Sequence, residues 1–271
     1  MEEHRHLPDS NRFSVLTATI LLAYALTPFV TIPESKFILQ LPGMVFPFRL
    51  TFSSLVAVLV ALLAAIGTDW LLRGHPHLGK QNTLQHSLLP AMTAWVIGLP
   101  LSALITGPAW WVVFTLGGIL LALVFLSEYI VVDFSDLRHA PATVGLTAVS
   151  FALFLILAIA VYNTALRLYL LLPALVIPMA LVSLRSLYLR LGGRWCITWS
   201  IGISLVVGQI AMALHYWPLS PLSYGLFLLG PAYALTSMAG SVEEQRPWAT
   251  LWIEPAVMLV IFWGLAFILG K

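Results

Sequence analysis

Long apolar stretches follow one another along the chain and are separated only by short polar connections. Stretches such as Leu50 to Gly67 and Leu251 to Leu269 are long enough to cross the hydrocarbon core of a bilayer, which takes about 20 residues of helix. Only 9% of the residues are charged and 60% are hydrophobic, whereas a soluble domain has about 25% charged residues. The sequence therefore predicts a polytopic integral membrane protein.

The apolar stretches predict an all-α bundle of about nine transmembrane helices that forms a single domain over residues 1–271. No soluble domain is predicted, because even the two longest connections, 32–47 and 69–86, are too short to fold alone. Eight spans result if the third and fourth stretches, separated by Gly107-Pro108, form one helix. The nine predicted helices lie near 13–31, 48–68, 87–106, 109–132, 141–163, 167–189, 195–215, 218–239 and 248–269.

The distribution of basic residues predicts the orientation, since cytoplasmic loops are enriched in Lys and Arg. With the N-terminus inside, nine basic residues lie on the cytoplasmic side and four on the other side. The nine are Arg5, Arg12, Arg73, Lys80, Arg138, Arg185, Arg190, Arg194 and Arg246, and the four are Lys36, Arg49, Arg167 and Lys271. We expect a cytoplasmic (inner) membrane protein with its N-terminus inside and its C-terminus outside.

The first apolar stretch also has the outline of a cleavable signal peptide. Arg5 and Arg12 precede it, and Ala23-Tyr24-Ala25 has the small-residue pattern of a cleavage site. Acidic residues dilute the basic segment, however, and the apolar run continues to Val30, which favours a retained helix. Both alternatives stay open, and a new N-terminus near Leu26 on the purified protein would indicate cleavage.

Small residues recur at intervals of four on several predicted helices, which places each set on one helix face. Because lipid is as apolar as leucine, membrane helices associate where small residues let their backbones approach. These faces can pack within the chain or against a second copy or another membrane protein. The sets are Thr19, Ala23 and Thr27; Ser53, Ala57, Ala61 and Ala65; Ala94, Gly98 and Ser102; and Ser200, Ser204 and Gly208.

Prolines interrupt the third, sixth and eighth predicted helices, at Pro90, Pro100, Pro173, Pro178, Pro221 and Pro231. Each removes a backbone donor and frees a carbonyl group. Broken helices in paired positions are one indication of a transporter. Leu88 to Ala91 recurs as Leu171 to Ala174 three spans later, which fits an inverted repeat. Kinks needed only for packing explain the same prolines.

Ionisable residues at membrane depth are costly and commonly line polar paths. The candidates for binding a substrate or ion are Glu128, Asp133, Arg185 and Glu254. On the predicted topology they approach one leaflet, so Glu128 or Glu254 can pair with Arg185. The alternative explanation is a satisfied ion pair, or side chains that extend to the headgroups.

Arg49 and Arg167 lie at the predicted outer helix ends. A guanidinium group binds phosphate or carboxylate with two parallel hydrogen bonds, so both residues are candidates for contact with an anionic headgroup.

His75, His77 and His86 are weak candidates for a metal site in the connection after the second helix. Imidazole is a common zinc ligand, but the spacing lacks the helical H-E-x-x-H pattern. We therefore predict no metal and no other cofactor.

No catalytic residue is predicted, because the chain lacks a nucleophile elbow, a Walker A loop and a dinucleotide fingerprint. A formal charge of +2, with basic residues at the membrane edges, excludes nucleic acid as a partner. The bilayer is the predicted environment. The sequence favours a small permease or ion-coupled transporter; the alternatives are a non-catalytic subunit or assembly factor of a membrane complex and, third, a membrane-embedded lipid-modifying enzyme.

Overall fold

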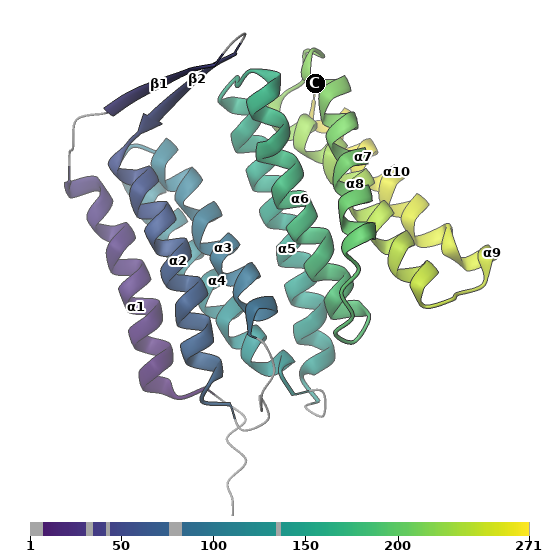
Figure 1. The fold of residues 1–271 in the computed structure, drawn as a ribbon, viewed down its shortest axis with the longest axis horizontal. Coiled ribbons are helices and arrows are strands. Elements are labelled where there is room, and N and C mark those ends of the chain that lie inside the picture. The colour runs from purple at the N-terminus through teal and green to yellow at the C-terminus, as the bar shows by residue number, and fades with distance from the viewer. Residues whose placement is uncertain (1–7, 31–34, 42–43, 76–82, 134–136, 271) are drawn as a thin grey trace, which may run out of the picture. The chain divides into compact units, whose positions relative to one another are not determined.

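The computed structural model describes residues 8–30, 35–41, 44–75, 83–133 and 137–270. The chain divides into two compact units, Met1–His139 and Ala140–Lys271 (Figure 1). The interpretation of the chain as a single domain stays a prediction.

The first unit contains four long helices and a β-hairpin (Figure 1). A short 3-10 helix, Thr27–Phe29, extends the first helix. The elements are α1 (Ser10–Leu26), β1 (Ser35–Leu41), β2 (Met44–Leu50), α2 (Phe52–Leu72), α3 (Leu84–Ala103) and α4 (Pro108–Val131).

The second unit is helical over its described residues. The four-residue helix α9 precedes α10, which runs alongside α8 (Figure 1). The elements are α5 (His139–Asn163), α6 (Leu168–Arg190), α7 (Ile197–His215), α8 (Pro221–Glu243), α9 (Trp248–Leu251) and α10 (Ile253–Leu269).

The predicted membrane helix bundle is confirmed: each of the nine predicted spans corresponds to one long helix of the described chain. Seven of these helices are long and apolar enough to cross a membrane. The two others are α3, which begins with the polar sequence Gln85-His86-Ser87, and α10, a shorter apolar helix of 17 residues. Since α3 ends at Ala103 and α4 begins at Pro108, the third and fourth helices are separate.

Local sequence sets where several helices begin. Thr51 and Ser54 form a capping box at the start of α2. The side chain of each residue accepts a hydrogen bond from the backbone N–H of the other. Ser220 caps α8 by accepting from the N–H of Ser223, and Pro221 occupies the first helical position. Pro221 therefore begins a helix and does not interrupt one.

The structure has a β-hairpin where the sequence predicts an irregular connection at 32–47. Its strands are antiparallel and pair from Ser35 with Leu50 to Leu41 with Met44. The predicted start of the second helix near position 48 was wrong, because β2 continues to Leu50 and the capping box fixes the helix start after Thr51. Pro42-Gly43, between two segments rich in β-branched and aromatic residues, is the sequence signal that indicates a hairpin.

Large side chains of α1 pack against glycines of the other helices in the first unit. A Cβ atom added at Gly98 of α3 would lie 2.9 Å from Tyr24 Oη, and one added at Gly118 of α4 would lie 2.9 Å from Leu21 Cδ2. The buried face of α1 consists of Leu16, Ile20 and Tyr24. The predicted face of Thr19, Ala23 and Thr27 is exposed or half-buried, because the small residues that permit close packing belong to the partner helices.

In the second unit, the predicted small-residue face of α7 is buried. Ser200 and Ser204 are each 2% exposed, and a Cβ added at Gly208 would lie 2.6 Å from Val176 Cγ2 of α6. This face is therefore the seam between α6 and α7.

The helices α3, α6 and α8 continue through their internal prolines. Pro231 lacks the N–H that would bond to the carbonyl of Phe227, four residues earlier. Trp263 of α10 donates its indole N–H to that carbonyl at 3.3 Å. Gly230 lets the indole approach, since an added Cβ would lie 3.1 Å from Trp263 Cδ1. The sequence Gly230-Pro231 thus creates the docking position for α10 on α8.

Candidate functional site

A partly open cavity of about 610 Å³ lies on the second unit, and Val144 and Ala148 in its wall are exposed. Its walls come from α5, α6, α8 and α10, together with Arg246 from the segment between α8 and α9. The lining residues are Thr143, Val144, Thr147, Ala148, Phe151, Ala152, Leu155, Ser186, Leu187, Arg190, Leu229, Tyr233, Thr236, Ser237, Arg246, Glu254, Met258 and Phe262.

Apolar and aromatic side chains form most of the cavity wall. Phe151 of α5 meets the ring of Tyr233 edge-on, with the ring centres 5.2 Å apart. Phe262 of α10 meets the same ring from another side at 6.4 Å. Tyr233 of α8 therefore connects three helices around the cavity, and an apolar molecule would contact carbon atoms along this wall.

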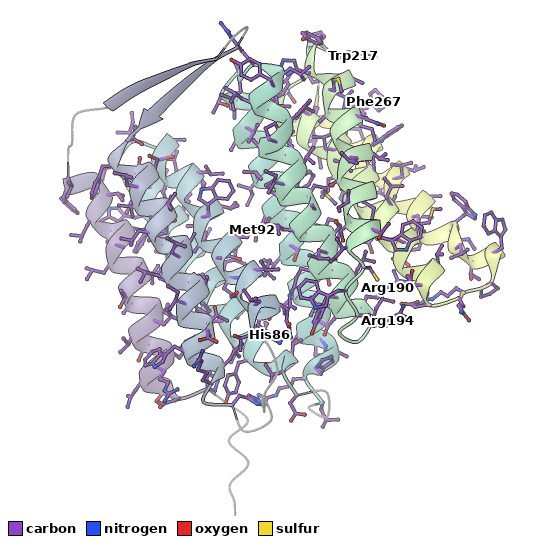
Figure 2. All side chains as sticks on the ribbon, viewed as in Figure 1. His86, Met92, Arg190, Arg194, Trp217 and Phe267 are labelled. Atoms are coloured by element: carbon purple, nitrogen blue, oxygen red, sulfur yellow. The ribbon has the colours of Figure 1, made fainter. Side chains whose placement is uncertain are left out.

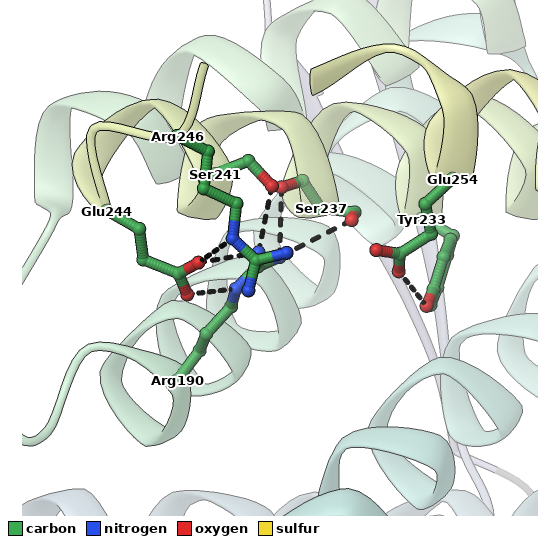
Figure 3. Close-up of polar contacts among 7 residues, drawn as sticks. All are labelled: Arg190, Tyr233, Ser237, Ser241, Glu244, Arg246 and Glu254. Atoms are coloured by element: carbon green, nitrogen blue, oxygen red, sulfur yellow. Dashed lines mark hydrogen bonds and ion pairs between the residues drawn. The ribbon is translucent and has the colours of Figure 1, made fainter. Parts of the chain in front are cut away.

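One carboxylate faces the cavity beside this aromatic cluster. Tyr233 donates its O–H to Glu254 Oε1 at 2.9 Å (Figure 3). Glu254 lies in the first turn of α10, where the partial positive charge of the helix N-terminus stabilises an anion.

Arg190 forms a hydrogen-bond network with the C-terminal part of α8 (Figure 3). Its Nε and Nη2 donate to the two oxygens of Glu244 at 2.6 and 3.1 Å, the bidentate geometry of a strong ion pair. Its Nη1 donates to the Ser237 carbonyl at 2.9 Å, and its Nη2 donates to Ser241 Oγ at 2.8 Å. An added Cβ at Gly240 would lie 2.8 Å from Arg190 Cδ, so a side chain at this position would displace the Arg190 side chain.

A second guanidinium reaches the same carboxylate. Arg246 Nε lies 2.6 Å from Glu244 Oε2. The hydrogen bond from Arg190, supported by the charges of both arginines, holds the pKa of Glu244 below its ordinary value against the opposing effect of burial. Two positive charges therefore share one negative charge at this end of the cavity.

These charges gather at one end of the second unit. Arg190 and Arg194 lie at that end, while Trp217 and Phe267 lie at the opposite end (Figure 2). Arg194 pairs with Glu243 at 2.9 Å and does not line the cavity. Arg190 in the last turn of α6 is also stabilised by the partial negative charge of the helix C-terminus.

Two residues that line the cavity have hydroxyl groups that are buried without a hydrogen-bond partner among the described residues. They are Thr143 Oγ1 of α5 and Ser186 Oγ of α6, and Ser186 is 3% exposed. A buried hydroxyl without a partner is costly, and both oxygens are closed off from the cavity surface.

The four predicted binding residues are divided between the units. Glu128 is 0% exposed in α4 and lies 2.8 Å from His86 Nδ1 of α3, and Asp133 follows the end of α4. Arg185 of α6 is buried, with its guanidinium 5.5 Å from the ring centre of Tyr188. Only Glu254 lines the cavity, and pairing of Arg185 with Glu128 or Glu254 stays a prediction.

The contacts of two of the three histidine candidates for a metal site are visible in the structure. His86 contacts Glu128, and the ring of His75 meets Tyr129 at 4.5 Å. His77 lies outside the described residues. Within the described ranges, no three His, Cys, Asp or Glu side chains lie together as metal ligands.

Arg167 is exposed at the start of α6, at the end opposite to Arg190. Arg49 pairs through its backbone with Lys36 in the hairpin. Contact of either residue with an anionic headgroup stays a prediction.

Sequence reasoning missed Arg190, Glu244 and Arg246 as site residues. A signal was present, because Ser237, Ser241 and Glu244 are spaced by four and three residues and share one face of α8. A polar face at the end of an apolar helix indicates a charged partner from another helix.

A protein-family comparison matches residues 32–269 to the family described as "Protein of unknown function (DUF5656)". The match covers most of the chain, which therefore belongs to the DUF5656 family. No curated protein and no solved structure matches the chain.

Proposed function

We propose that this member of the DUF5656 family is a small permease that binds an amphipathic molecule in the cavity of its second unit. The observation that carries the proposal is the cavity of about 610 Å³, with apolar walls and a few polar groups. This volume falls in the range of about 300–1,000 Å³ that is typical of small-molecule sites. A scaffold that only packs against lipid or protein needs no such cavity.

Glu254 supports coupling of the permease to an ion. An ionisable side chain in a transmembrane segment commonly marks an ion or proton path. Glu254 lines the cavity and accepts a hydrogen bond from Tyr233. We propose that Glu254 takes up and releases the coupling proton and that Tyr233 orients its carboxylate.

The helices that line the cavity supply elements able to move. The helices α6 and α8 both contribute walls, and they contain Pro178 and Pro231. A proline weakens the local backbone ladder and permits bending. We propose that bending at these positions opens and closes the cavity.

We propose that the charged end of the cavity faces the cytoplasmic side of an inner membrane. Arg190 and Arg194 lie at this end (Figure 2), and Arg246 joins Arg190 at Glu244; a cluster of basic residues is typical of the cytoplasmic side.

Uptake by proteoliposomes tests the proposal. Vesicles containing the full-length protein are exposed to a lipid and metabolite extract of the producing cells, and their contents are identified by mass spectrometry. We expect at least one amphipathic compound to accumulate. Ala148→Phe fills the cavity and should abolish the accumulation, whereas Ala213→Phe on the exposed face of α7 should leave it unchanged.

An imposed pH gradient tests the role of Glu254. The gradient should increase accumulation by the unaltered protein, and Glu254→Gln should remove the increase while ligand retention persists. Accumulation that is equal in empty vesicles, or that survives Ala148→Phe, would contradict the permease proposal.

A subunit of a membrane complex is the second candidate. Gly202 of α7 supports it, because a Cβ added there would meet nothing within 4 Å and the surrounding helix face is open to a neighbour. A stoichiometric protein partner retained in native mass spectrometry, and lost in Gly202→Leu, would favour this candidate over the permease.

A further inference from the structure

The charged end of the cavity has an excess of positive charge around Glu244. Arg190 and Arg246 both contact its carboxylate (Figure 3). The cluster of these three residues has a net charge of +1, since Glu244 remains ionised at neutral pH between two guanidinium groups. The carboxylate of Glu254, which also lines the cavity, is bound separately by Tyr233.

The two arginines differ in how many of their N–H donors are already used in hydrogen bonds within the protein. The nitrogens of Arg190 donate to Glu244, Ser237 and Ser241. Arg246 contacts the carboxylate through Nε, and its two terminal nitrogens have no hydrogen bond within the described ranges. The side chain of Arg246 is 51% exposed and lines the cavity.

The two terminal nitrogens of Arg246 can donate hydrogen bonds to an oxyanion. A guanidinium group presents a planar set of N–H donors that fits phosphate or carboxylate with two hydrogen bonds. Arg246 shares the cavity with the apolar side chains of Phe151, Leu229 and Phe262.

We infer that the ligand of this cavity is an amphipathic anion. Its phosphate or carboxylate headgroup binds Arg246, and its hydrocarbon chain lies along the apolar wall. Glu244 is the internal counter-ion of both guanidinium groups and competes with the headgroup for Arg246. The inference rests on the proposed function and adds the chemical class of the ligand.

The negative charge of Glu254 repels an anionic headgroup from its part of the cavity. Glu254 lines the same cavity and is held by Tyr233. A like charge beside it is unfavourable, so the anionic headgroup binds on the Arg246 side. A cationic amphiphile would reverse this preference and bind beside Glu254.

Photolabelling with matched probes tests the inference. The probes are dodecyl phosphate, dodecanoic acid, dodecanol and dodecylamine, each with a diazirine on the alkyl chain. The full-length protein is held in phosphatidylcholine nanodiscs, and labelled peptides are identified by mass spectrometry. We expect the phosphate, the carboxylate or both to label the cavity helices at concentrations at least tenfold lower than the alcohol or the amine.

Two variants and a control locate the headgroup. Arg246→Gln should raise the half-maximal concentration of the anionic probe about tenfold or more and leave the alcohol unchanged. Glu244→Gln removes the internal counter-charge and should lower that concentration severalfold. Arg194→Gln removes an exposed arginine that pairs with Glu243 outside the cavity and should have no effect.

The outcomes separate this inference from the proposed function. Equal labelling by all four probes, preferred labelling by the amine, or an Arg246→Gln variant that binds the anion like the unaltered protein would overturn the anionic class alone. Labelling of the cavity helices that Ala148→Phe does not reduce would instead contradict the binding site. Preference for phosphate or for carboxylate identifies which headgroup the anion has.

Discussion

Glu244, at the end of α8, contacts the guanidinium groups of both Arg190 and Arg246. A carboxylate in contact with two cations is more acidic than in the unfolded chain. Its side chain is 25% exposed, so solvent partly screens the interaction. The effect on stability is therefore expected to be modest and dependent on pH.

The pH dependence has a definite direction. Because the pKa of Glu244 is lowered in the folded protein, its contribution to stability is fully present above the ordinary glutamate pKa of about 4.3. The contribution is lost as the pH falls through the lower folded pKa. Thermal unfolding in an uncharged detergent should show that the unaltered protein is more stable than Glu244→Gln at pH 7. This difference in stability should shrink below about pH 4.3. A difference that grows on acidification would contradict the assignment.

Of the four binding residues predicted from the sequence, Glu254 lines the cavity. Glu254 was recognisable because a carboxylate within an apolar span is costly and needs a role. Arg190 and Arg246 were counted only as interfacial charges, since nothing in one linear sequence tells which helix ends meet. Their convergence on Glu244 depends on the packing of α6 against α8 and on Gly240, which permits the approach.

Helix α8 is the element on which much of the second unit packs. It contributes Tyr233 and Ser237 to the cavity, and it receives α10 at the carbonyl freed by Pro231. The sequence indicated that this carbonyl needs a partner. It did not indicate Trp263, because the partner lies on another helix.

A double-mutant cycle tests this contact between α8 and α10. Trp263→Phe should lower the free energy of unfolding by about 1 kcal/mol, because the Phe227 carbonyl loses its donor. In a Pro231→Ala background the restored N–H bonds to that carbonyl, so Trp263→Phe should cost less there. Chemical unfolding in detergent gives both values. Equal costs in the two backgrounds would show that the indole N–H and Pro231 are independent.

The number of long helices could be predicted from the apolar stretches, because each connection between them contains turn residues or charges that end a span. The hairpin at 35–50 was not predicted, since its apolar segments resemble the start of the following helix. The cavity was not predictable either. Its walls come from residues far apart in sequence, and ordinary apolar side chains line most of it.

The arrangement of the whole molecule across the membrane gives a further prediction. An odd number of spans with basic residues concentrated on one side places the termini on opposite faces. A reporter active only in the cytoplasm should be active when fused to the N-terminus and inactive when fused to the C-terminus. A reporter active only outside should give the reverse result. Both termini on one face would contradict the nine-span topology.

The central claim is that the second unit holds an amphipathic molecule, and native mass spectrometry tests it most directly. The full-length protein is released gently from its own membrane and compared with Ala148→Phe in the cavity wall and Ala213→Phe on an exposed face. We expect the unaltered protein and Ala213→Phe to retain the same small molecule, and Ala148→Phe to lose it. Retention by all three proteins, or by none, would contradict the claim.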